Sequence, residues 1–174
     1  MESFIQNRSF KIIIIASLLF LNVGCDQVSK AVVRNSIDYH DRISLFQSHL
    51  TLTKVENTGA FLGMGKSIPE FVRIFALIII PILVMLYGVY FMIQKHVSNY
   101  TLLGLGFMIG GGIGNIFDRI VHGSVTDFLH IDFIIFETGI FNMADVSIMT
   151  GLFIMIIPMV IGAKPSNASN NKNM

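Results

Sequence analysis

Apolar residues in this chain are gathered into four long stretches that are separated by polar segments. The stretches cover about residues 10–31, 71–93, 100–120 and 141–161. Each is long enough, or nearly so, to cross about 30 Å of hydrocarbon as a helix, which takes roughly 20 residues. The pattern therefore predicts an all-α membrane protein with four transmembrane helices.

The two longer connections differ in character. Within residues 35–70, short extended segments at 43–46 and 50–55 are punctuated by Asn57 and several glycines. This pattern predicts a small sheet or strand pair at the membrane surface, a β segment after the first helix. The connection at 122–140, before the fourth helix, is shorter, and a helix is one conformation open to it. Both connections are expected to be extracytoplasmic.

The chain is expected to form one domain with a polar tail. Residues 1–163 hold all four spans and their connections, and we predict a single integral-membrane domain there. Residues 164–174 are rich in Asn and Ser and lack apolar residues that could form a core, so we expect a disordered tail.

Composition supports a membrane location and excludes several classes of protein. Hydrophobic residues make up 53% of the chain and charged residues only 13%, whereas about a quarter of the residues in soluble domains are charged. An ordinary soluble enzyme and a disordered chain are therefore excluded. The net charge of +1 gives no basic surface for a phosphate polymer, so nucleic acid is not an expected partner.

Small residues in the third span predict close helix packing. Gly106, Gly110 and Gly114 recur at every fourth position and so lie on one face of a helix. Glycine lets helix backbones approach each other closely inside a membrane. We therefore expect this span to lie against a neighbour along that face.

Orientation depends on charges in the connections. Five Lys and Arg lie on the side of the termini, and five lie in the first long connection on the other side. The connection at 122–140 holds Asp127, Asp132 and Glu137 but no Lys or Arg, which favours an external location. This difference predicts that both termini are cytoplasmic.

Alternation of four antiparallel spans places many polar residues at one face of the membrane. An ionisable group at membrane depth costs about 2.5 to 3.5 kcal/mol on insertion scales, so such a group usually has a function. The alternatives are that each side chain extends to the interface, or that some of them neutralise their neighbours and hold helices together. The set comprises Asp26, Lys30, Asn57, Asn115, Asp118, Arg119, Asp127, Asn142 and Asp145.

Two of these carboxylates can meet. Asn142 and Asp145 share a helix face at the start of the fourth span, and Asp127 can approach from the preceding connection. Two adjacent carboxylates favour a state that shares one proton, so that one acts as base and the other as acid. Such a dyad can activate water against a peptide carbonyl. The spacing leaves three other carboxylates as alternative members of such a pair: Asp118, Asp132 and Glu137.

Five short motifs follow one another along most of the chain. They are DQVSK at 26–30, ENTGAF at 56–61, GGIGNIFDR at 111–119, VTDF at 125–128 and FNMADVSI at 141–148. In this order, on a chain with four spans, they resemble the motifs of the bacterial lipoprotein signal peptidase family, also called signal peptidase II. Each motif alone is weak, but five in order make the match specific.

The resemblance implies a reaction and a place for it. A member of this family is an aspartic endopeptidase of the bacterial inner membrane that removes the signal peptide from a prolipoprotein, cutting before the diacylglyceryl-modified cysteine. The active site would lie at the extracytoplasmic face, and no cofactor or metal would be needed. Expected partners are diacylglyceryl-prolipoproteins, membrane lipid and cyclic peptide antibiotics such as globomycin, and we expect a monomer.

The resemblance also implies roles for single residues. Asp127 and Asp145 match the catalytic dyad. The positions that surround substrate in the family correspond to Asn57, Gly59, Gly111, Asn115, Arg119, Asn142 and Ala144. Three further polar positions match residues with a structural role: Asp26, Lys30 and Asp118.

Other functions are weighed against this one. A transporter or channel would need polar residues through the membrane depth, whereas 78–86 and 152–157 are apolar. A noncatalytic scaffold would tolerate Asn in place of Asp127 or Asp145. The segment before Cys25 also resembles a lipoprotein signal peptide, but Asn22 stands where Leu is usual and processing would remove the first span. A free, packed cysteine is therefore expected.

Overall fold

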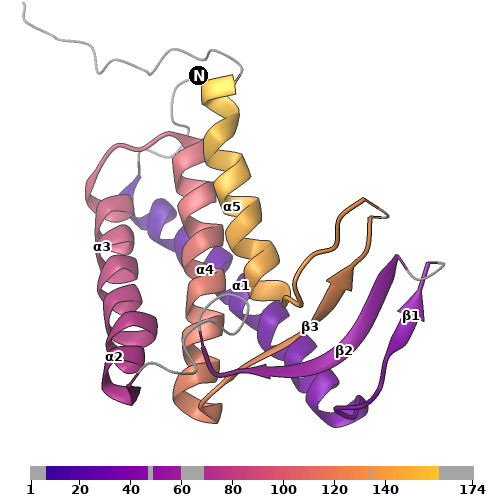
Figure 1. Ribbon diagram of the computed structural model, residues 1–174. Coiled ribbons are helices and arrows are strands. Elements are labelled where there is room, and N and C mark those ends of the chain that lie inside the picture. The colour runs from indigo at the N-terminus through magenta and orange to yellow at the C-terminus, as the bar shows by residue number, and fades with distance from the viewer. Residues whose placement is uncertain (1–6, 47–48, 60–68, 134, 161–174) are drawn as a thin grey trace, which may run out of the picture.

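The computed structural model describes residues 7–46, 49–59, 69–133 and 135–160. Four long helical segments lie side by side, and a small sheet lies beside one end of the bundle (Figure 1). All four segments are long and apolar enough to cross a membrane, which confirms the predicted spans. They are α1 (Arg8–Ser36), α2 with η2 and α3 (Glu70–Ile74, Phe75–Ile79 and Ile80–Gln94), α4 (Asn99–His122) and α5 (Met143–Val160).

Helix ends are set by local hydrogen bonds. The side chain of Asn7 accepts from the backbone N–H of Ser9 at 2.9 Å and caps α1, because the first N–H groups of a helix have no partner within it. Ser98 caps α4 in the same way. At the other end of α4, Gly123 has a φ of 75° and ends the helix in the left-handed conformation that glycine adopts readily.

The prediction of close packing in the third span is confirmed at atomic detail. Gly106, Gly110 and Gly114 of α4 each leave no room for a Cβ because a side chain of α1 occupies the space. The α1 side chains also recur at every fourth position: Leu18, Asn22 and Asp26. Two helices with the same period therefore interlock along a shared face, with Asp26 and Gly114 at the end of that face nearest the sheet.

A second face of α4 packs against α5. A Cβ on Gly104 would lie 2.7 Å from the backbone oxygen of Gly151, and a Cβ on Gly111 would overlap the backbone oxygen of Ala144. Backbone atoms cannot move aside as a flexible side chain can. Glycine at these positions therefore sets the separation of the two helices, including the separation at the start of α5.

The sheet has three antiparallel strands in the order β1-β2-β3 (Ile43–Leu45, Leu50–Asn57 and Val125–Ile131). The strand pair expected after the first span is confirmed. The alternative of a helix in the connection at 122–140 is wrong as a prediction, because this segment contains β3. Pairing with β2 supplies partners for the backbone groups at an edge that would otherwise be open. Sequence alone does not reveal that pairing.

An irregularity in β2 sets the register near the bundle. The pairing shifts between Leu52 and Val55, which places Val55 opposite Asp127 and Asn57 opposite Val125. One extra residue in a strand produces such a bulge and redirects the side chains that follow it. Asn57 and Asp127 are consequently diagonal neighbours.

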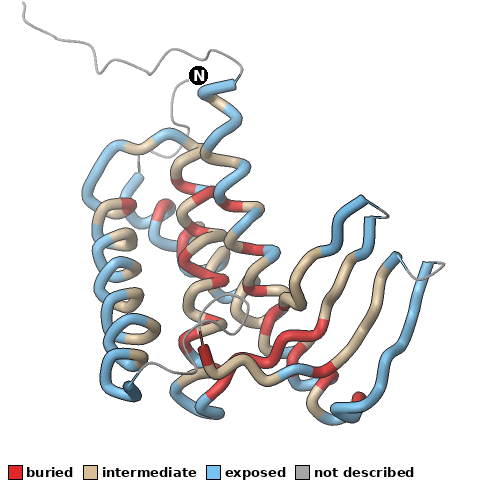
Figure 2. The backbone as a smooth tube through the Cα atoms, viewed as in Figure 1, coloured by how far each residue is buried: buried red, intermediate tan, exposed pale blue. Residues whose placement is uncertain are grey.

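Buried residues concentrate along α4 and where β3 meets the helices (Figure 2). Phe128 of β3 packs against Val33 and Ile37 near the end of α1, which holds the sheet on the bundle. Most other faces of the spans expose apolar side chains, as expected of helices that contact lipid. The predicted tail at 164–174 and the end of the 56–61 motif lie outside the described residues, so the domain and tail boundaries stay predictions.

Candidate active site

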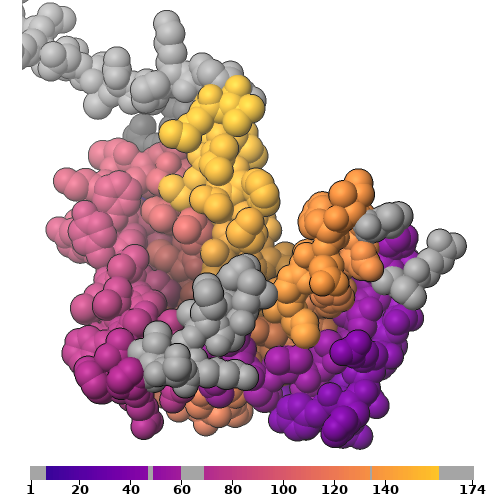
Figure 3. Space-filling view, viewed as in Figure 1, coloured from indigo at the N-terminus to yellow at the C-terminus, as the bar shows by residue number. Residues whose placement is uncertain are grey.

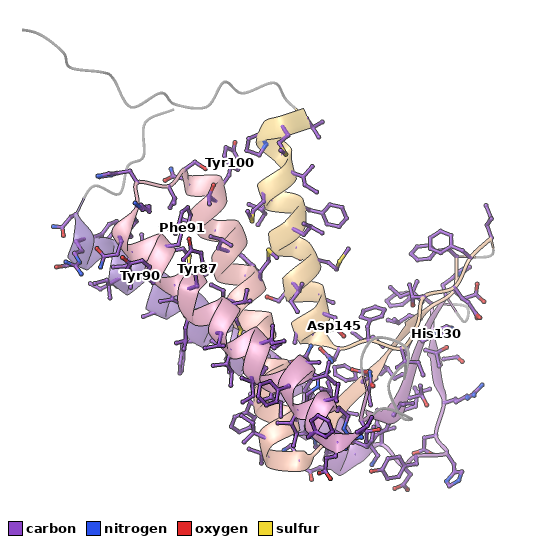
Figure 4. All side chains as sticks on the ribbon, turned by 60° about the vertical axis from the view of Figure 1, so that its left-hand side comes forward. Tyr87, Tyr90, Phe91, Tyr100, His130 and Asp145 are labelled. Carbon is purple, nitrogen blue, oxygen red and sulfur yellow. The ribbon has the colours of Figure 1, made fainter. Side chains whose placement is uncertain are left out.

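The first turn of α5 holds one carboxylate in place. The side-chain oxygen of Asn142 accepts from the backbone N–H of Asp145 at 3.1 Å, and the Asp145 carboxylate accepts from the backbone N–H of Asn142 at 3.2 Å. This reciprocal pair is a capping box, in which each side chain satisfies an unpaired N–H at the helix start. Figure 4 shows Asp145 at the foot of α5, beside the sheet.

The second carboxylate, Asp127, lies on β3 and is only 4% exposed. One of its oxygens accepts from the side-chain amide of Asn57 at 3.0 Å and the other from the side-chain amide of Asn142 at 2.6 Å. Asn142 therefore contacts both carboxylates, that of Asp127 through its side-chain nitrogen and that of Asp145 through its backbone N–H. The structure brings together the two aspartates that the motifs single out.

Asn115 of α4 completes the group of amides. Its nitrogen donates to Asp145 at 2.9 Å, while its oxygen accepts from Asn142 at 3.1 Å and from the ammonium of Lys30 at 3.0 Å. An ammonium can only donate, so the amide oxygen must face Lys30 and the amide nitrogen must face Asp145. Lys30 thus fixes the direction of the hydrogen bond that reaches the carboxylate.

Lys30 itself belongs to a buried ion network between helices. It is fully buried and lies 2.8 Å from Asp26 and 3.1 Å from Asp118. The other oxygen of Asp26 accepts from the backbone N–H of Ala144 at 2.9 Å. The three charged residues therefore connect α1, α4 and the first turn of α5, and each buried charge has an opposite partner.

Arg119 joins the end of α4 to the segment after β2. Its guanidinium donates to the backbone oxygens of Asn115 at 3.3 Å and Gly59 at 3.4 Å. The backbone N–H of Gly59 in turn donates to the side-chain oxygen of Asn57 at 3.1 Å. The Nε atom of Arg119 is buried and has no hydrogen-bond partner among the described residues.

Two of the candidate site residues act through packing. Gly111 lies against the backbone of Ala144, which is fully buried. The space beside Gly111 is filled by the first turn of α5, so Gly111 sets how closely Asp145 approaches α4.

The surroundings of Asp127 change its acidity. The pKa of Asp127 is raised to about 6, chiefly by burial and also by the nearby charge of Asp145, while hydrogen bonds from Asn57 and Asn142 act to lower it. Burial disfavours the charged form, and its effect outweighs that of the two donors. Asp127 therefore keeps a proton under weakly acidic conditions.

A cavity of about 740 Å³ extends from Asp127 across the sheet. Figure 3 shows the surface hollowed between α5 and the segment that follows β3. His130, labelled with Asp145 in Figure 4, lines this cavity on the sheet side. Hydroxyl and amide groups line much of the rest: Ser44, Thr51, Thr53, Asn57 and Thr138. An extended polar backbone would find hydrogen-bond partners there.

The other carboxylates that sequence reasoning left open have different surroundings. Asp118 is held by Lys30 and by Arg34, at 3.1 and 2.9 Å. Asp132 and Glu137 lie on the segment beyond β3 and line the cavity farther along. In the described part of the chain, no group of three or more His, Cys, Asp or Glu side chains could hold a metal ion.

One expectation about the first span is wrong. Cys25 is exposed on α1, not packed. The neighbouring Asp26 faces α4, and consecutive residues of a helix point about 100° apart, so Cys25 is directed away from α4.

Sequence reasoning also missed two members of the ion network. Gln27 donates to Asp26, to Asp118 and to the backbone of Gly114 at 3.1 to 3.2 Å. Arg34 binds Asp118 and donates to the Thr126 hydroxyl at 2.8 Å. The spacing of 26, 30 and 34, one polar residue per helical turn, was the signal that could have found Arg34.

Four candidate spans with two aspartates beside the end of the bundle define an integral membrane protein with a carboxylate site. Comparison with known proteins gives the family. The family described as signal peptidase (SPase) II matches residues 18–161. The chain therefore belongs to the signal peptidase II family, which makes it a protease and a multi-pass bacterial membrane protein, and the resemblance drawn from the five motifs is confirmed.

Individual relatives and a solved structure agree with this family assignment. The lipoprotein signal peptidase of Streptococcus pneumoniae is 33% identical over 149 residues, which cover 84% of this chain and 92% of that protein. That of Bacillus subtilis is 32% identical over 146 residues, 83% and 91% of the two chains. A bacterial membrane enzyme solved by the in meso method is similar with a TM-score of 0.72 at 26% identity, covering 99% of this chain and 98% of its own.

Proposed function

We propose that this protein is an aspartic endopeptidase that removes the signal peptide from diacylglyceryl-modified prolipoproteins by cleaving before the lipidated cysteine. The observation that carries the proposal is the contact of Asn142 with both Asp127 and Asp145. Family membership supports the substrate class. The positions of the two aspartates, on β3 and on the first turn of α5, support their use as one catalytic pair.

The different surroundings of the two carboxylates support different roles. Asp127, with a pKa of about 6, is the carboxyl that we assign as the proton donor. Asp145 then acts as the base. It takes a proton from water while the water oxygen bonds to the peptide carbonyl carbon, and Asp127 gives its proton to the carbonyl oxygen. Collapse of this intermediate breaks the C–N bond: Asp145 gives its proton to the leaving amine, and a hydroxyl of the intermediate returns a proton to Asp127.

Residues around the pair are proposed to hold the substrate. Arg119 has a buried Nε without a partner among the described residues, which can donate to a carbonyl of an extended peptide. Asn57 and Gly59 would line one side of the peptide, and Asn115 and Asn142 would orient the carboxylates. Gly111 and Ala144 would set the spacing between α4 and α5, and the ion network of Asp26, Lys30 and Asp118 would hold the helices in position. Alignment of a mobile substrate reduces the entropy cost of the reaction.

Location and partners follow from the same proposal. Both termini would be cytoplasmic and the site would lie at the extracytoplasmic face of the inner membrane. The start of α1 and the end of α5 lie at the end of the bundle opposite the sheet, which supports one common side for them (Figure 1). The protein would act as a monomer in lipid without a cofactor, and cyclic peptides such as globomycin would bind in the active site.

A gel-shift assay with purified protein and a diacylglyceryl-modified prolipoprotein tests the proposal. Wild type should cleave, and Asp127→Asn and Asp145→Asn should each lose cleavage while keeping their folded yield. Asp132→Asn is the matched control, because Asp132 lines the same cavity farther along the sheet. Cleavage by either of the first two variants would move the chemistry to another carboxylate. Absence of cleavage by folded wild type would favour a scaffold or transporter.

A further inference from the structure

The far end of the sheet exposes large apolar side chains on two neighbouring turns. One turn follows β1 and the other follows β3, and two hydrogen bonds between Asp132 and His49, at 3.0 and 2.9 Å, join them. We call the apolar side chains of these turns and of β1 the sheet tip. It consists of Ile43, Leu45, Phe46, Phe133, Ile135 and Phe136, with Ile135 93% exposed.

Polar and apolar residues are segregated in the turn after β3. Asp132, Glu137 and Thr138 line the cavity of the site. Phe133 and Phe136, from the same turn, are exposed, and their rings stack at 4.7 Å. A turn in water would have no reason to gather its aromatic side chains on the surface away from the cavity.

The turn after β1 carries an exposed aromatic residue whose backbone conformation is unusual. Phe46 has a φ of 50°, a left-handed conformation that favours glycine or asparagine and is unfavourable for a bulky side chain. Its ring is 77% exposed, so packing within the protein does not account for it. A ring held in this conformation at an exposed turn indicates contact with something outside the chain.

The position of the sheet tip in the fold identifies what its side chains contact. The sheet projects sideways from the foot of the bundle, and its far end lies at the height of the lower half of α5 in Figure 1. In that half α5 exposes Val146 and Met149, which face lipid if α5 spans the membrane. The sheet tip therefore continues the lipid-facing surface of the spans.

We propose that the sheet tip inserts its side chains into the leaflet on the side of the site, with the strand backbone at the level of the headgroups. The depth is limited because the outer edge of β1 has unpaired backbone groups that need water. Aromatic side chains are favoured at this level of a membrane. The cavity over the sheet is then bordered by lipid, and the membrane-anchored substrate of the proposed function reaches it from the side.

The experiment uses the absence of tryptophan from the chain. Phe136→Trp introduces a single indole at a position 62% exposed, and Phe153→Trp introduces one on α5 at a position 61% exposed. His40→Trp places an indole at the opposite end of the sheet. Each full-length variant is reconstituted in phosphatidylcholine vesicles with bromine near the glycerol or near the middle of the acyl chains, and cleavage activity verifies folding.

The expected result is that lipid brominated near the glycerol quenches Phe136→Trp and lipid brominated near the middle of the acyl chains quenches Phe153→Trp, while aqueous iodide quenches only His40→Trp strongly. Phe46→Trp should behave like Phe136→Trp and repeats the test on the other turn. Strong iodide quenching of both tip variants without quenching by brominated lipid would overturn the proposal. Protection from both quenchers would also overturn it, because the tip would then contact another copy of the chain.

Discussion

Asn142 donates to Asp127 at 2.6 Å and is also the residue that caps the helix in which Asp145 lies. One side chain thus serves local structure and the candidate site together. Its oxygen satisfies the helix start, and its nitrogen is left to bind the carboxylate on the neighbouring strand. The position of one aspartate relative to the other therefore depends on how a helix begins.

Variants of Asn142 should separate its role in capping the helix from its contact with Asp127. Asn142→Ala removes both, and we expect a loss of about 1 kcal/mol in unfolding free energy from the cap and a loss of about 10²-fold in kcat/KM from misplacement. Asn142→Ser keeps an acceptor for the cap but has no amide to donate to Asp127. Its melting temperature should stay near that of wild type while cleavage falls. Equal loss of stability in both variants would show that capping is not the structural role.

The pH dependence of activity should report Asp127. Its pKa of about 6 predicts that kcat/KM declines as pH rises through that value, because the proton donor becomes ionised. Asn57→Ala removes a hydrogen bond that favours the charged form, so the pKa rises and the decline moves to higher pH. A pH–rate profile of both proteins on one prolipoprotein measures the shift. A decline that moves to lower pH would contradict the assignment.

The same pKa predicts a pH dependence of stability. Because the pKa of Asp127 is raised from 3.8 to about 6 in the folded state, the folded protein binds the proton more tightly. The associated stability is fully present below about pH 4 and is lost as pH rises through 6, by about 3 kcal/mol. The melting temperature of wild type relative to Asp127→Asn, followed in detergent, should therefore fall between pH 4 and 7. A difference that is constant with pH would exclude this linkage.

Helix separation at the site should depend on Gly111. In Gly111→Ala the new Cβ overlaps the backbone oxygen of Ala144, which cannot move without shifting the start of α5. We expect a lower melting temperature and a loss of about 10²-fold in kcat/KM, the effect of a displacement of about 1 Å. Gly88→Ala is the matched control, because its Cβ meets only the flexible end of Ile109 at 2.9 Å. Similar losses in the two variants would argue against a specific role for Gly111.

Removal of the buried ammonium of Lys30 should lower the free energy of unfolding. Lys30→Met leaves Asp26 and Asp118 without their shared partner, and loss of one member of a buried pair typically costs about 3 to 5 kcal/mol. Adding Asp118→Asn removes one uncompensated charge and should restore part of the melting temperature. If the double variant were less stable by the sum of the two single losses, the residues would not be coupled.

The sequence predicted the helices because a membrane requires about 20 consecutive apolar residues, a pattern that needs no knowledge of the fold. It also predicted the face of α4 that carries Gly106, Gly110 and Gly114. It did not predict β3, because residues 125–131 form a strand only where β2 offers a partner edge. The pairing partner is about 70 residues away, and local propensity does not contain it.

The candidate site was predicted in part, and for a similar reason. The motifs identified Asp127 and Asp145 through resemblance, and the structure places both beside Asn142. Spacing alone left Asp118 as an alternative, because the ion network that occupies it arises from α1. Gln27 and Arg34 were missed, since their role depends on which face of α1 meets α4.

Asp26 and Lys30 lie one turn apart on α1 and bind each other at 2.8 Å, so their charges cancel within a single helix. This bears on the order of assembly. The first span can enter the bilayer during synthesis with these two charges already paired, before Asp118 of α4 has been made. When α4 arrives, Lys30 acquires its second carboxylate, and Asp26 can later accept the backbone N–H of Ala144. The third and fourth spans thus each complete a contact left open by the first, and the site forms only when the last helix is inserted.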